Sequence, residues 1–251
     1  MTKAQTPKRT RPRDALRGIS LFMDLEDRDL EGIAALAITK RYRARQVIVR
    51  QQEPGDELFA IMQGHTKVVT SDADGHDTVL AVMGPGQVFG EVSLLDGAPR
   101  SATIIALASC ELLAIRREPF MAYLEAHPKI ATRLLVVLAG RLRRLTKRAE
   151  DIAFLDVAGR LAKKLLGLAE EYGMALGNQV RVVVKLSQQE LGDMVGTSRE
   201  SVNKHLRAWE QQGIISQQSG YLTIHDLPRL RTLACCEANE PATLSPASVG
   251  K

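Results

Sequence analysis

Apolar residues recur at two different spacings along the chain, and each change of spacing marks a different kind of element. Residues 14–39 follow a helical spacing, in which positions i, i+3, i+4 and i+7 share one face. The residues at these positions are Leu30, Ile33, Ala34 and Ala37. Asp27 precedes them and is a plausible N-cap. The pattern predicts short helices over residues 14–39.

From about residue 41 to residue 118 the spacing is that of short β-strands. Six runs rich in aliphatic residues and threonine lie at 46–50, 58–62, 66–70, 78–82, 103–106 and 111–115. Turn-forming residues separate the runs: Pro54-Gly55, Gly64, Asp74-Gly75, Gly84-Pro85-Gly86 and Asp96-Gly97. This rhythm is typical of a small antiparallel barrel or sandwich. With helices on both sides of it, the chain is predicted to have an α+β fold.

Residues 118–156 return to helical spacing and carry a heptad seam. The seam positions alternate between three and four residues apart: Leu135, Leu138, Leu142, Leu145, Ala149 and Ile152. Arginines and lysines between 141 and 148 lie off this seam. The helix could pack on its own domain or pair in parallel with a second copy of the chain. Because the apolar stripe is narrow, we favour the second interpretation and predict a homodimer.

The C-terminal third predicts helices interrupted by short strands. Asp156 can cap a helix over 157–172, and Gly173 and Gly177 then break the chain. A strand-like stretch at 179–185, two helical segments within 187–212, a hairpin over 214–225 hinged at Ser219-Gly220 and a last helix over 226–234 follow. The two ends, 1–13 and 235–251, have a composition typical of disordered segments.

The charge of the chain is unevenly distributed. The chain carries 34 basic and 29 acidic side chains, a formal net charge of +5. Residues 1–13 hold five of the cations and no acid, so residues 14–251 are neutral overall. Bulk charge is therefore no evidence that the folded part binds nucleic acid. Aromatic residues make up only 4% of the chain, which argues against stacking of single-stranded bases.

Several other classes of protein are disfavoured by composition. The three cysteines, Cys110, Cys235 and Cys236, lack C-x-x-C spacing, which argues against a disulfide framework, a zinc site and an iron-sulfur cluster. No apolar run reaches 18 residues, and the basic N-terminus leads into charged residues where a signal peptide would be apolar. We expect a cytoplasmic protein that does not enter a membrane. No arrangement of catalytic side chains is detectable, so an enzyme is not expected.

Residues 89–103 combine groups that suit a nucleotide. Gly90 and Glu91 open a short apolar helical turn, and Arg100 and Ser101 follow a Gly-x-Pro bend. Backbone N–H groups at a helix start and an arginine can bind a phosphate, whereas Glu91 would repel it and suits a sugar hydroxyl. The alternative is a structural turn in which Glu91 simply pairs with Arg100.

Two capped helices follow in the C-terminal third. Ser187-Gln188-Gln189-Glu190 is a capping box, and Gly196 ends the helix that it opens. Ser198 and its neighbours open a second helix. Arg199, Glu200 and Lys204 lie near the start of that second helix, where a DNA-reading helix-turn-helix contacts base edges. The alternative is an ordinary helical hairpin with a solvated charged face.

Both segments resemble one protein family. Residues 89–103 are similar to the phosphate-binding cassette of cyclic-nucleotide-binding domains, F-G-E-x-x-L followed by P-R-S/A-A-T. Residues 196–206 resemble the recognition-helix signature G-x-S-R-E-x-V-x-[RK]-x-L of the bacterial cyclic-AMP receptor/FNR transcription regulators, and residues 153–160 resemble the hinge of that family. The resemblance runs from about residue 19 to residue 226.

The resemblance implies an architecture and a function. It implies a cyclic-nucleotide-binding β-roll over 14–127, a dimerisation helix over 128–155 and a winged helix-turn-helix over 156–234. Glu91 would bind the ribose 2′-hydroxyl, and Arg100 and Ser101 the cyclic phosphate. The ligand set implied is Val68, Leu80, Gly90, Glu91, Val92, Ser93, Arg100, Ser101, Leu145 and Thr146. The DNA contacts implied are Ser187, Gln188, Ser198, Arg199, Glu200 and Lys204. A TGTGA-like palindrome in double-stranded DNA and RNA polymerase are the implied partners.

The chain departs from the family where the base of the ligand would bind. A Thr-Ser pair contacts the adenine in the cyclic-AMP receptors, and the aligned residues here are Leu145 and Thr146. Leu145 cannot hydrogen-bond a purine, so cyclic AMP is expected but cyclic GMP is possible. Residues 1–40 contain no cysteine, so the iron-sulfur sensor of the FNR branch is excluded, and the histidines show no metal-ligand spacing.

Two alternatives remain from the sequence. The chain could be a cyclic-nucleotide-binding regulatory subunit that acts through protein contacts, or a DNA-binding regulator that no longer needs a ligand. Whether the protein activates or represses, and which genes it controls, is not encoded in these motifs.

Overall fold

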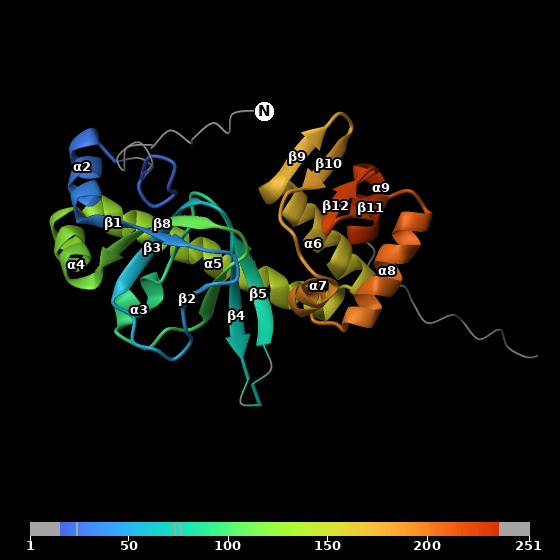
Figure 1. The fold of residues 1–251 in the computed structure, drawn as a ribbon, viewed down its shortest axis with the longest axis horizontal. Helices are drawn as coiled ribbons and strands as arrows, with labels where there is room; N and C mark the ends of the chain where they lie inside the picture. Colours follow the sequence, from blue (N-terminus) through green and yellow to red (C-terminus); the bar gives the residue numbers. More distant parts are fainter. Residues whose placement is uncertain (1–15, 24, 73, 76, 236–251) are drawn as a thin grey trace, which may run out of the picture. The chain divides into compact units, whose positions relative to one another are not determined.

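The computed structural model describes residues 16–23, 25–72, 74–75 and 77–235, and these residues form two compact units that meet at Arg144 and Leu145. Each unit is described separately below. Figure 1 shows the elements of both. The tails that the sequence predicts at 1–13 and 235–251 lie outside the described residues, except for Cys235, which is the C-cap of helix α9 (Leu227–Ala234).

The first unit contains two antiparallel four-stranded sheets. One has the order β1-β8-β3-β6, and the other has the order β2-β7-β4-β5. The strands are β1 (Ala37–Tyr42), β2 (Val47–Val49), β3 (Glu57–Gln63), β4 (Thr66–Ser71), β5 (Asp77–Met83), β6 (Val88–Phe89), β7 (Thr103–Ala106) and β8 (Cys110–Arg116). All six strands predicted from the sequence are present. They carry the β-branched and aliphatic residues that pack well on a pleated surface.

Buried side chains fill this unit in two clusters. One cluster includes Phe59 and Phe89, whose rings stack with centroids 5.0 Å apart. The other includes Leu58, Leu94 and Phe120 and extends to the helices of the unit. These helices are α2 (Asp27–Leu36), α3 (Glu91–Asp96), α4 (Arg117–Ala126) and the first part of α5 (Pro128–Phe154).

The start of the chain differs from its sequence-based prediction. The predicted helical face continued to Ala37, but α2 ends at Leu36 and Ala37 begins β1. Pairing of all six β1 residues with β8 outweighs the local helical spacing. Asp27 is the first residue of α2 rather than its N-cap, which is Glu26.

The predicted helix over 118–156 is two helices. α4 ends at Ala126, and α5 begins at Pro128. A proline disfavours helical backbone at the residue before it, and His127 has φ −131° and ψ 74°. Proline suits the first turn of a helix, so α5 can start there and continue for 27 residues.

The second unit contains a small sheet and four further helices. Its sheet has the order β11-β12-β10-β9. Its elements are α6 (Val157–Tyr172), β9 (Gly173–Leu176), β10 (Gln179–Val182), α7 (Gln188–Val195), α8 (Arg199–Gln211), β11 (Ile215–Gln218), β12 (Tyr221–Ile224) and α9 (Leu227–Ala234). The predicted cap is confirmed, because the Asp156 carboxylate accepts a hydrogen bond from Gly159 N at 2.7 Å. Strand β9 was not predicted; Gly177, at φ +61°, turns the chain so that β9 pairs with β10.

Candidate functional site

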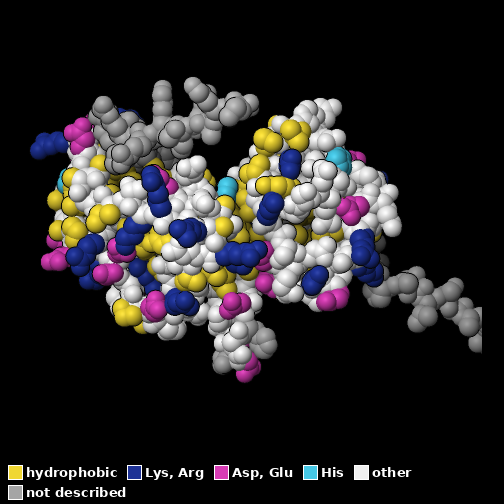
Figure 2. All heavy atoms as spheres, viewed as in Figure 1, with side chains coloured by type: hydrophobic (Ala, Val, Ile, Leu, Met, Phe, Trp, Pro, Cys, Tyr) yellow, Lys and Arg dark blue, Asp and Glu magenta, His cyan; other side chains and the backbone are white. Residues whose placement is uncertain are grey.

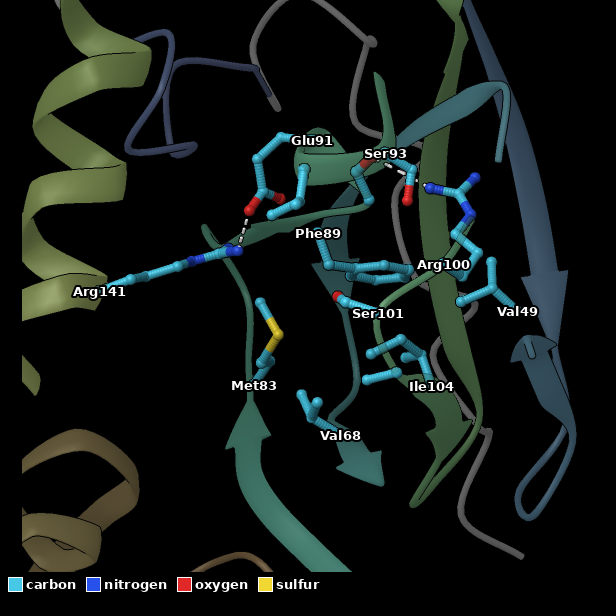
Figure 3. A pocket seen from close by; sticks show the side chains of 13 residues that line it. Val49, Val68, Met83, Phe89, Glu91, Ser93, Arg100, Ser101, Ile104 and Arg141 are labelled. Atoms are coloured by element: carbon cyan, nitrogen blue, oxygen red, sulfur yellow. Dashed lines mark hydrogen bonds and ion pairs between the residues drawn. The ribbon is translucent and has the colours of Figure 1, made fainter. Parts of the chain in front are cut away.

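An open pocket lies in the first unit, between the two sheets and α3. The empty space inside it is about 430 Å³ when the open solvent at its mouth is included. The residues that line it are Val49, Val68, Met83, Phe89, Gly90, Glu91, Val92, Ser93, Arg100, Ser101, Ala102, Ile104 and Arg141. Figure 3 shows Arg141 and Arg100 on opposite sides of this pocket, with Val68, Met83 and Ile104 along another wall.

The structure brings together most of the ligand set predicted from the sequence. Val68 of β4 and the cassette residues Gly90, Glu91, Val92, Ser93, Arg100 and Ser101 all line the pocket. Leu80 lies in β5, half-buried, and is not one of the lining residues. Leu145 and Thr146 lie on the part of α5 that belongs to the second unit. Contact of these three with a ligand stays a prediction.

Glu91 is fully buried and only partly satisfied. One carboxylate oxygen, Oε1, forms an ion pair with Arg141 Nη1, and Arg141 Nη2 also donates to the carbonyl of Val88. The other oxygen, Oε2, has no hydrogen-bond partner. An unpaired buried carboxylate oxygen is costly, so it is a strong acceptor for a hydroxyl group that enters the pocket. The structural alternative, a Glu91–Arg100 pair, is not present.

Arg100 is held in place by main-chain groups. Its side chain donates to Gly90 O at 3.0 Å and to Glu57 O at 2.8 Å, and its guanidinium lies 6.0 Å from the centre of the Phe59 ring. Burial lowers the pKa of Arg100, while Asp56, Glu57 and Glu91 act in the opposite direction. Its hydrogen-bond partners are neutral carbonyls, and none of the three carboxylates forms a hydrogen bond with it. The group is therefore ready to attract an anion.

Together these groups fit a ligand with both a hydroxyl and a negative charge. Glu91 accepts and Arg100 donates, and Ser101 adds a hydroxyl to the same pocket wall. Gly90 has φ +87°, a left-handed conformation that favours glycine, and a Cβ there would lie 2.6 Å from Arg100 Nη1. Sequence reasoning missed the charged residue Arg141 and also five uncharged lining residues: Val49, Met83, Phe89, Ala102 and Ile104. The only signal for Arg141 was a position just off the heptad seam, fifty residues from Glu91 along the chain.

In the second unit, α7 and α8 have the caps that the sequence predicts. The Ser187 hydroxyl accepts from Glu190 N at 3.2 Å, and the Glu190 carboxylate accepts from Ser187 N at 2.8 Å. Gly196 ends α7 at φ +69°. The Ser198 hydroxyl then accepts from Ser201 N at 3.2 Å and opens α8.

Helix α8 presents the predicted DNA-reading residues to solvent. Arg199, Glu200 and Lys204 are exposed, as are Ser187 and Ser198, and Gln188 is half-buried. The underside of the helix is buried through Val202, Leu206 and Trp209. The pKa of Glu200 is lowered, first by its own backbone N–H and then by the Ser198 hydroxyl, so Glu200 is ionised at neutral pH and can accept a hydrogen bond.

Two cations, Arg181 of β10 and Lys185 just after it, lie against Tyr221 of β12. The Tyr221 ring lies 4.4 Å from the Arg181 guanidinium and 4.7 Å from Lys185 Nζ, distances that suit cation–π contacts. Elsewhere, basic and acidic side chains are interspersed over the face that Figure 2 shows. That face therefore carries no broad basic surface.

Metal and membrane sites find no support among the residues that the structure describes. No group of three or more His, Cys, Asp and Glu side chains is placed to hold a metal ion. In the same residues, no helix is both long and apolar enough to cross a membrane.

Family models match both units. The cyclic nucleotide-binding domain model matches residues 39–127, and the Crp-like helix-turn-helix domain model matches residues 159–233. A CRP-like cAMP-activated global transcriptional regulator from Mycobacterium tuberculosis is 35% identical over 80% of this chain and 92% of its own length. The cAMP-activated global transcriptional regulator CRP from Escherichia coli is 30% identical over 79% of this chain and 95% of its own length.

Solved structures have the same fold. A c-di-GMP-responsive global regulator from Xanthomonas campestris has a TM-score of 0.70 and 25% identity, and the alignment covers 80% of this chain and 99% of that chain. A CRP/FNR-family transcriptional regulator from Thermus thermophilus has a TM-score of 0.66 and 26% identity, over 78% of this chain and 98% of that chain.

Proposed function

Because the chain belongs to the CRP/FNR family of transcription regulators, we propose that it is a homodimer that binds cyclic AMP in its first unit and DNA through α8. Members of this family are DNA-binding regulators and not enzymes. The single observation that carries the ligand proposal is the pairing, in one pocket, of the partly unsatisfied Glu91 with the carbonyl-bound Arg100.

The chemistry of the pocket supports a cyclic nucleotide. In this proposal the unpaired Glu91 Oε2 accepts from the ribose 2′-hydroxyl, and Arg100 and Ser101, which line the same pocket, donate to the cyclic phosphate. Val68, Met83 and Ile104 give the pocket an apolar wall for the rest of the ligand. We propose cyclic AMP because curated relatives from several bacteria are described as cAMP-activated. With Leu145 and Thr146 as the expected base contacts, cyclic GMP is the first competitor to test.

The exposed seam of α5 supports the homodimer. Within one chain, Leu135, Leu142 and Leu145 are each about two-thirds exposed, at 66%, 66% and 64%, and Ile152 is 53% exposed. Large apolar side chains in one stripe favour burial against a partner. Arg141 and Arg148 flank the seam at equivalent heptad positions. Antiparallel pairing would bring such arginines together, so a parallel pair of α5 helices is expected.

The exposed start of α8 supports DNA as the partner. Arginine and lysine suit guanine in the major groove, and glutamate suits the cytosine amino group. Arg199, Glu200 and Lys204 therefore favour G·C pairs of a TGTGA-like half-site, and Ser187, Gln188 and Ser198 are proposed to contact phosphates. RNA polymerase as a second partner follows from the family resemblance alone. A regulatory subunit that acts without DNA has no use for the helix-turn-helix, so we do not favour it.

Calorimetry tests the ligand assignment. Cyclic AMP and cyclic GMP are titrated separately into the wild-type chain, into Arg100→Ala and into a charge-matched control, Arg43→Ala. Arg43 is exposed and does not line the pocket. We expect Arg100→Ala to weaken binding by at least tenfold, since charged hydrogen bonds contribute about 1.5–3 kcal/mol each, and Arg43→Ala to bind as the wild type does. Equal affinity of Arg100→Ala and wild type would contradict the phosphate assignment.

A DNA-binding assay tests the second half of the proposal. Labelled duplexes that contain a TGTGA palindrome or a scrambled sequence are titrated with and without cyclic AMP. We expect the ligand to increase affinity for the palindrome only, and Arg199→Ala to remove that preference. Equal binding with and without ligand would favour a ligand-independent regulator, and no specific binding would favour the regulatory subunit.

A further inference from the structure

The first residue of α4, Arg117, is attached to the far end of the cassette helix α3. Its side-chain Nε donates to Leu94 O at 2.8 Å, and its backbone N donates to Asp56 O at 2.6 Å. Arg117 thus touches three segments: α4, the C-terminal end of α3, and the β2–β3 loop. That loop precedes Glu57, whose carbonyl holds Arg100.

The bond to Leu94 satisfies a group that the helix cannot satisfy itself. The last carbonyls of a helix have no partner within it. At the end of α3, Gly97 N donates a hydrogen bond to Ser93 O at 3.1 Å, and Arg117 Nε donates to the next carbonyl, that of Leu94. The Leu94 side chain is fully buried in the same cluster as Phe120 of α4 and Ile130 of α5. The end of α3 therefore cannot shift without breaking a charged hydrogen bond and disturbing this packing.

The start of α3 is attached as well, to the next helix. Glu91, its first residue, forms an ion pair with Arg141 of α5. Two arginines from consecutive helices, α4 and α5, hold the two ends of a helix only six residues long. The proposed ligand contacts lie on that same short helix and on Arg100. A movement of α3 on ligand binding would therefore act on α4 and α5 together, and α5 continues into the second unit.

We propose that Arg117 is a positioning residue that couples occupancy of the pocket to the helices α4 and α5, and through them to DNA binding. The inference rests on the proposed function. Arg117 does not line the pocket, so its effect is on the response to the ligand and not on direct contact with it. Coupling of this kind is the ratio of DNA affinities measured with and without ligand, and it is separate from ligand affinity itself.

Arg116 provides a matched control for the test. It is also an exposed arginine, one residue earlier, and among the described residues its side chain makes no hydrogen bond or ion pair. The variants Arg117→Ala, Arg117→Lys and Arg116→Ala are compared with wild type. Three quantities are measured for each: the Kd of cyclic AMP without DNA, the Kd of the palindromic duplex with and without saturating cyclic AMP, and amide exchange within α3.

We expect Arg117→Ala to reduce the ratio of the two DNA affinities by about tenfold, the lower end of what one charged hydrogen bond contributes, and to speed amide exchange in α3. Its cyclic-AMP affinity without DNA should change by less than about threefold. Arg117→Lys, which keeps the charge and a donor, should recover part of the ratio, and Arg116→Ala should match wild type.

Three outcomes would overturn the inference. In the first, the wild type responds to cyclic AMP and Arg117→Ala has the same ratio of DNA affinities with and without ligand. In the second, Arg116→Ala loses as much of this ratio as Arg117→Ala does. In the third, Arg117→Ala has a lower melting temperature but amide exchange in α3 is not faster. If the wild-type chain itself showed no ligand-dependent DNA binding, the proposed function would fail first. In that case, amide exchange in α3 that is the same in Arg117→Ala and wild type would still show that Arg117 does not hold α3 in place.

Discussion

Gly55 lies where the Arg100 side chain passes closest to the backbone of the β2–β3 loop. A Cβ at this position would lie 2.4 Å from Arg100 Nε and 2.6 Å from Cζ, both shorter than any stable contact. Arg100 is only 5% exposed and is already fixed by two carbonyls, so it has little space to yield. The missing side chain of Gly55 thus sets the position of the charge that the ligand is proposed to meet.

Replacement of Gly55 should therefore weaken ligand binding. We expect Gly55→Ala to displace the Arg100 guanidinium and to raise the Kd of cyclic AMP by about tenfold, comparable to loss of one charged hydrogen bond. Calorimetry measures the change. Gly167→Ala is the control, because no atom lies within 4 Å of a Cβ there, and an alanine within helix α6 should stabilise the fold by about 0.5–1 kcal/mol. Unaltered affinity in Gly55→Ala would show that the guanidinium can adapt.

At the residue scale, the pocket residues that could be predicted from the sequence are those that lie close together along the chain. A pocket residue that is distant along the chain was not predicted. Glu91, Arg100 and Ser101 fall within one motif, and all of them line the pocket. Arg141 reaches the same pocket from a different helix, and the sequence showed it only as one of several cations off the heptad seam. Only tertiary packing brings Arg141 to Glu91, and no local pattern encodes that approach.

At the scale of elements, the predicted caps are confirmed except for Asp27, which is the first residue of α2 and not its N-cap. Asp156, Ser187, Gly196 and Ser198 all end or begin helices as expected, because a cap depends on a hydrogen bond to a residue two to four positions away. Strands β1 and β9 were not predicted, because each depends on a partner strand. β1 pairs with β8, about seventy residues away along the chain. Its Ile38 is 58% exposed, so β1 lacks the alternation of buried and exposed residues that would identify a strand.

Helix α6 contains a lysine in an unfavourable position. Burial lowers the pKa of Lys164, the nearby charge of Arg148 lowers it further, and Glu171 partly opposes both. When the pKa of a lysine is lower in the folded state than in the unfolded state, folding disfavours its charged form. Lys164 therefore reduces stability at neutral pH, and this penalty disappears as the pH rises from the folded pKa through the unfolded value of about 10.5.

Removal of this charge should stabilise the second unit. We expect Lys164→Met to raise the free energy of unfolding at pH 7 and to have much less effect near pH 11, where Lys164 is largely neutral in both states. Denaturant unfolding at both pH values measures this. Lys163→Met is the control: Lys163 forms an ion pair with Asp151, so its loss should not stabilise the chain. A gain from Lys164→Met that persisted at pH 11 would point to packing of the methionine instead.

On the scale of the whole molecule, charge and recognition are in different places. All of the net charge of +5 belongs to residues 1–13, and the remainder carries equal numbers of basic and acidic side chains. Sequence preference is proposed to come from three side chains at the start of α8. Affinity for phosphates in general and preference for a base sequence are therefore separable in this chain.

Deletion of residues 2–13 should separate them in practice. Each tail cation that contacts a phosphate contributes about 0.9 to the slope of log K against log salt, so the truncated chain should bind scrambled DNA more weakly and with a shallower slope. Its affinity ratio between palindromic and scrambled duplexes should stay within about twofold of the full-length value, because Arg199, Glu200 and Lys204 are untouched. A full-length chain with Gln at the five basic tail positions controls for length and should behave like the deletion. Loss of the ratio in both variants would mean that the tail takes part in reading the sequence, and that the three residues of α8 do not suffice.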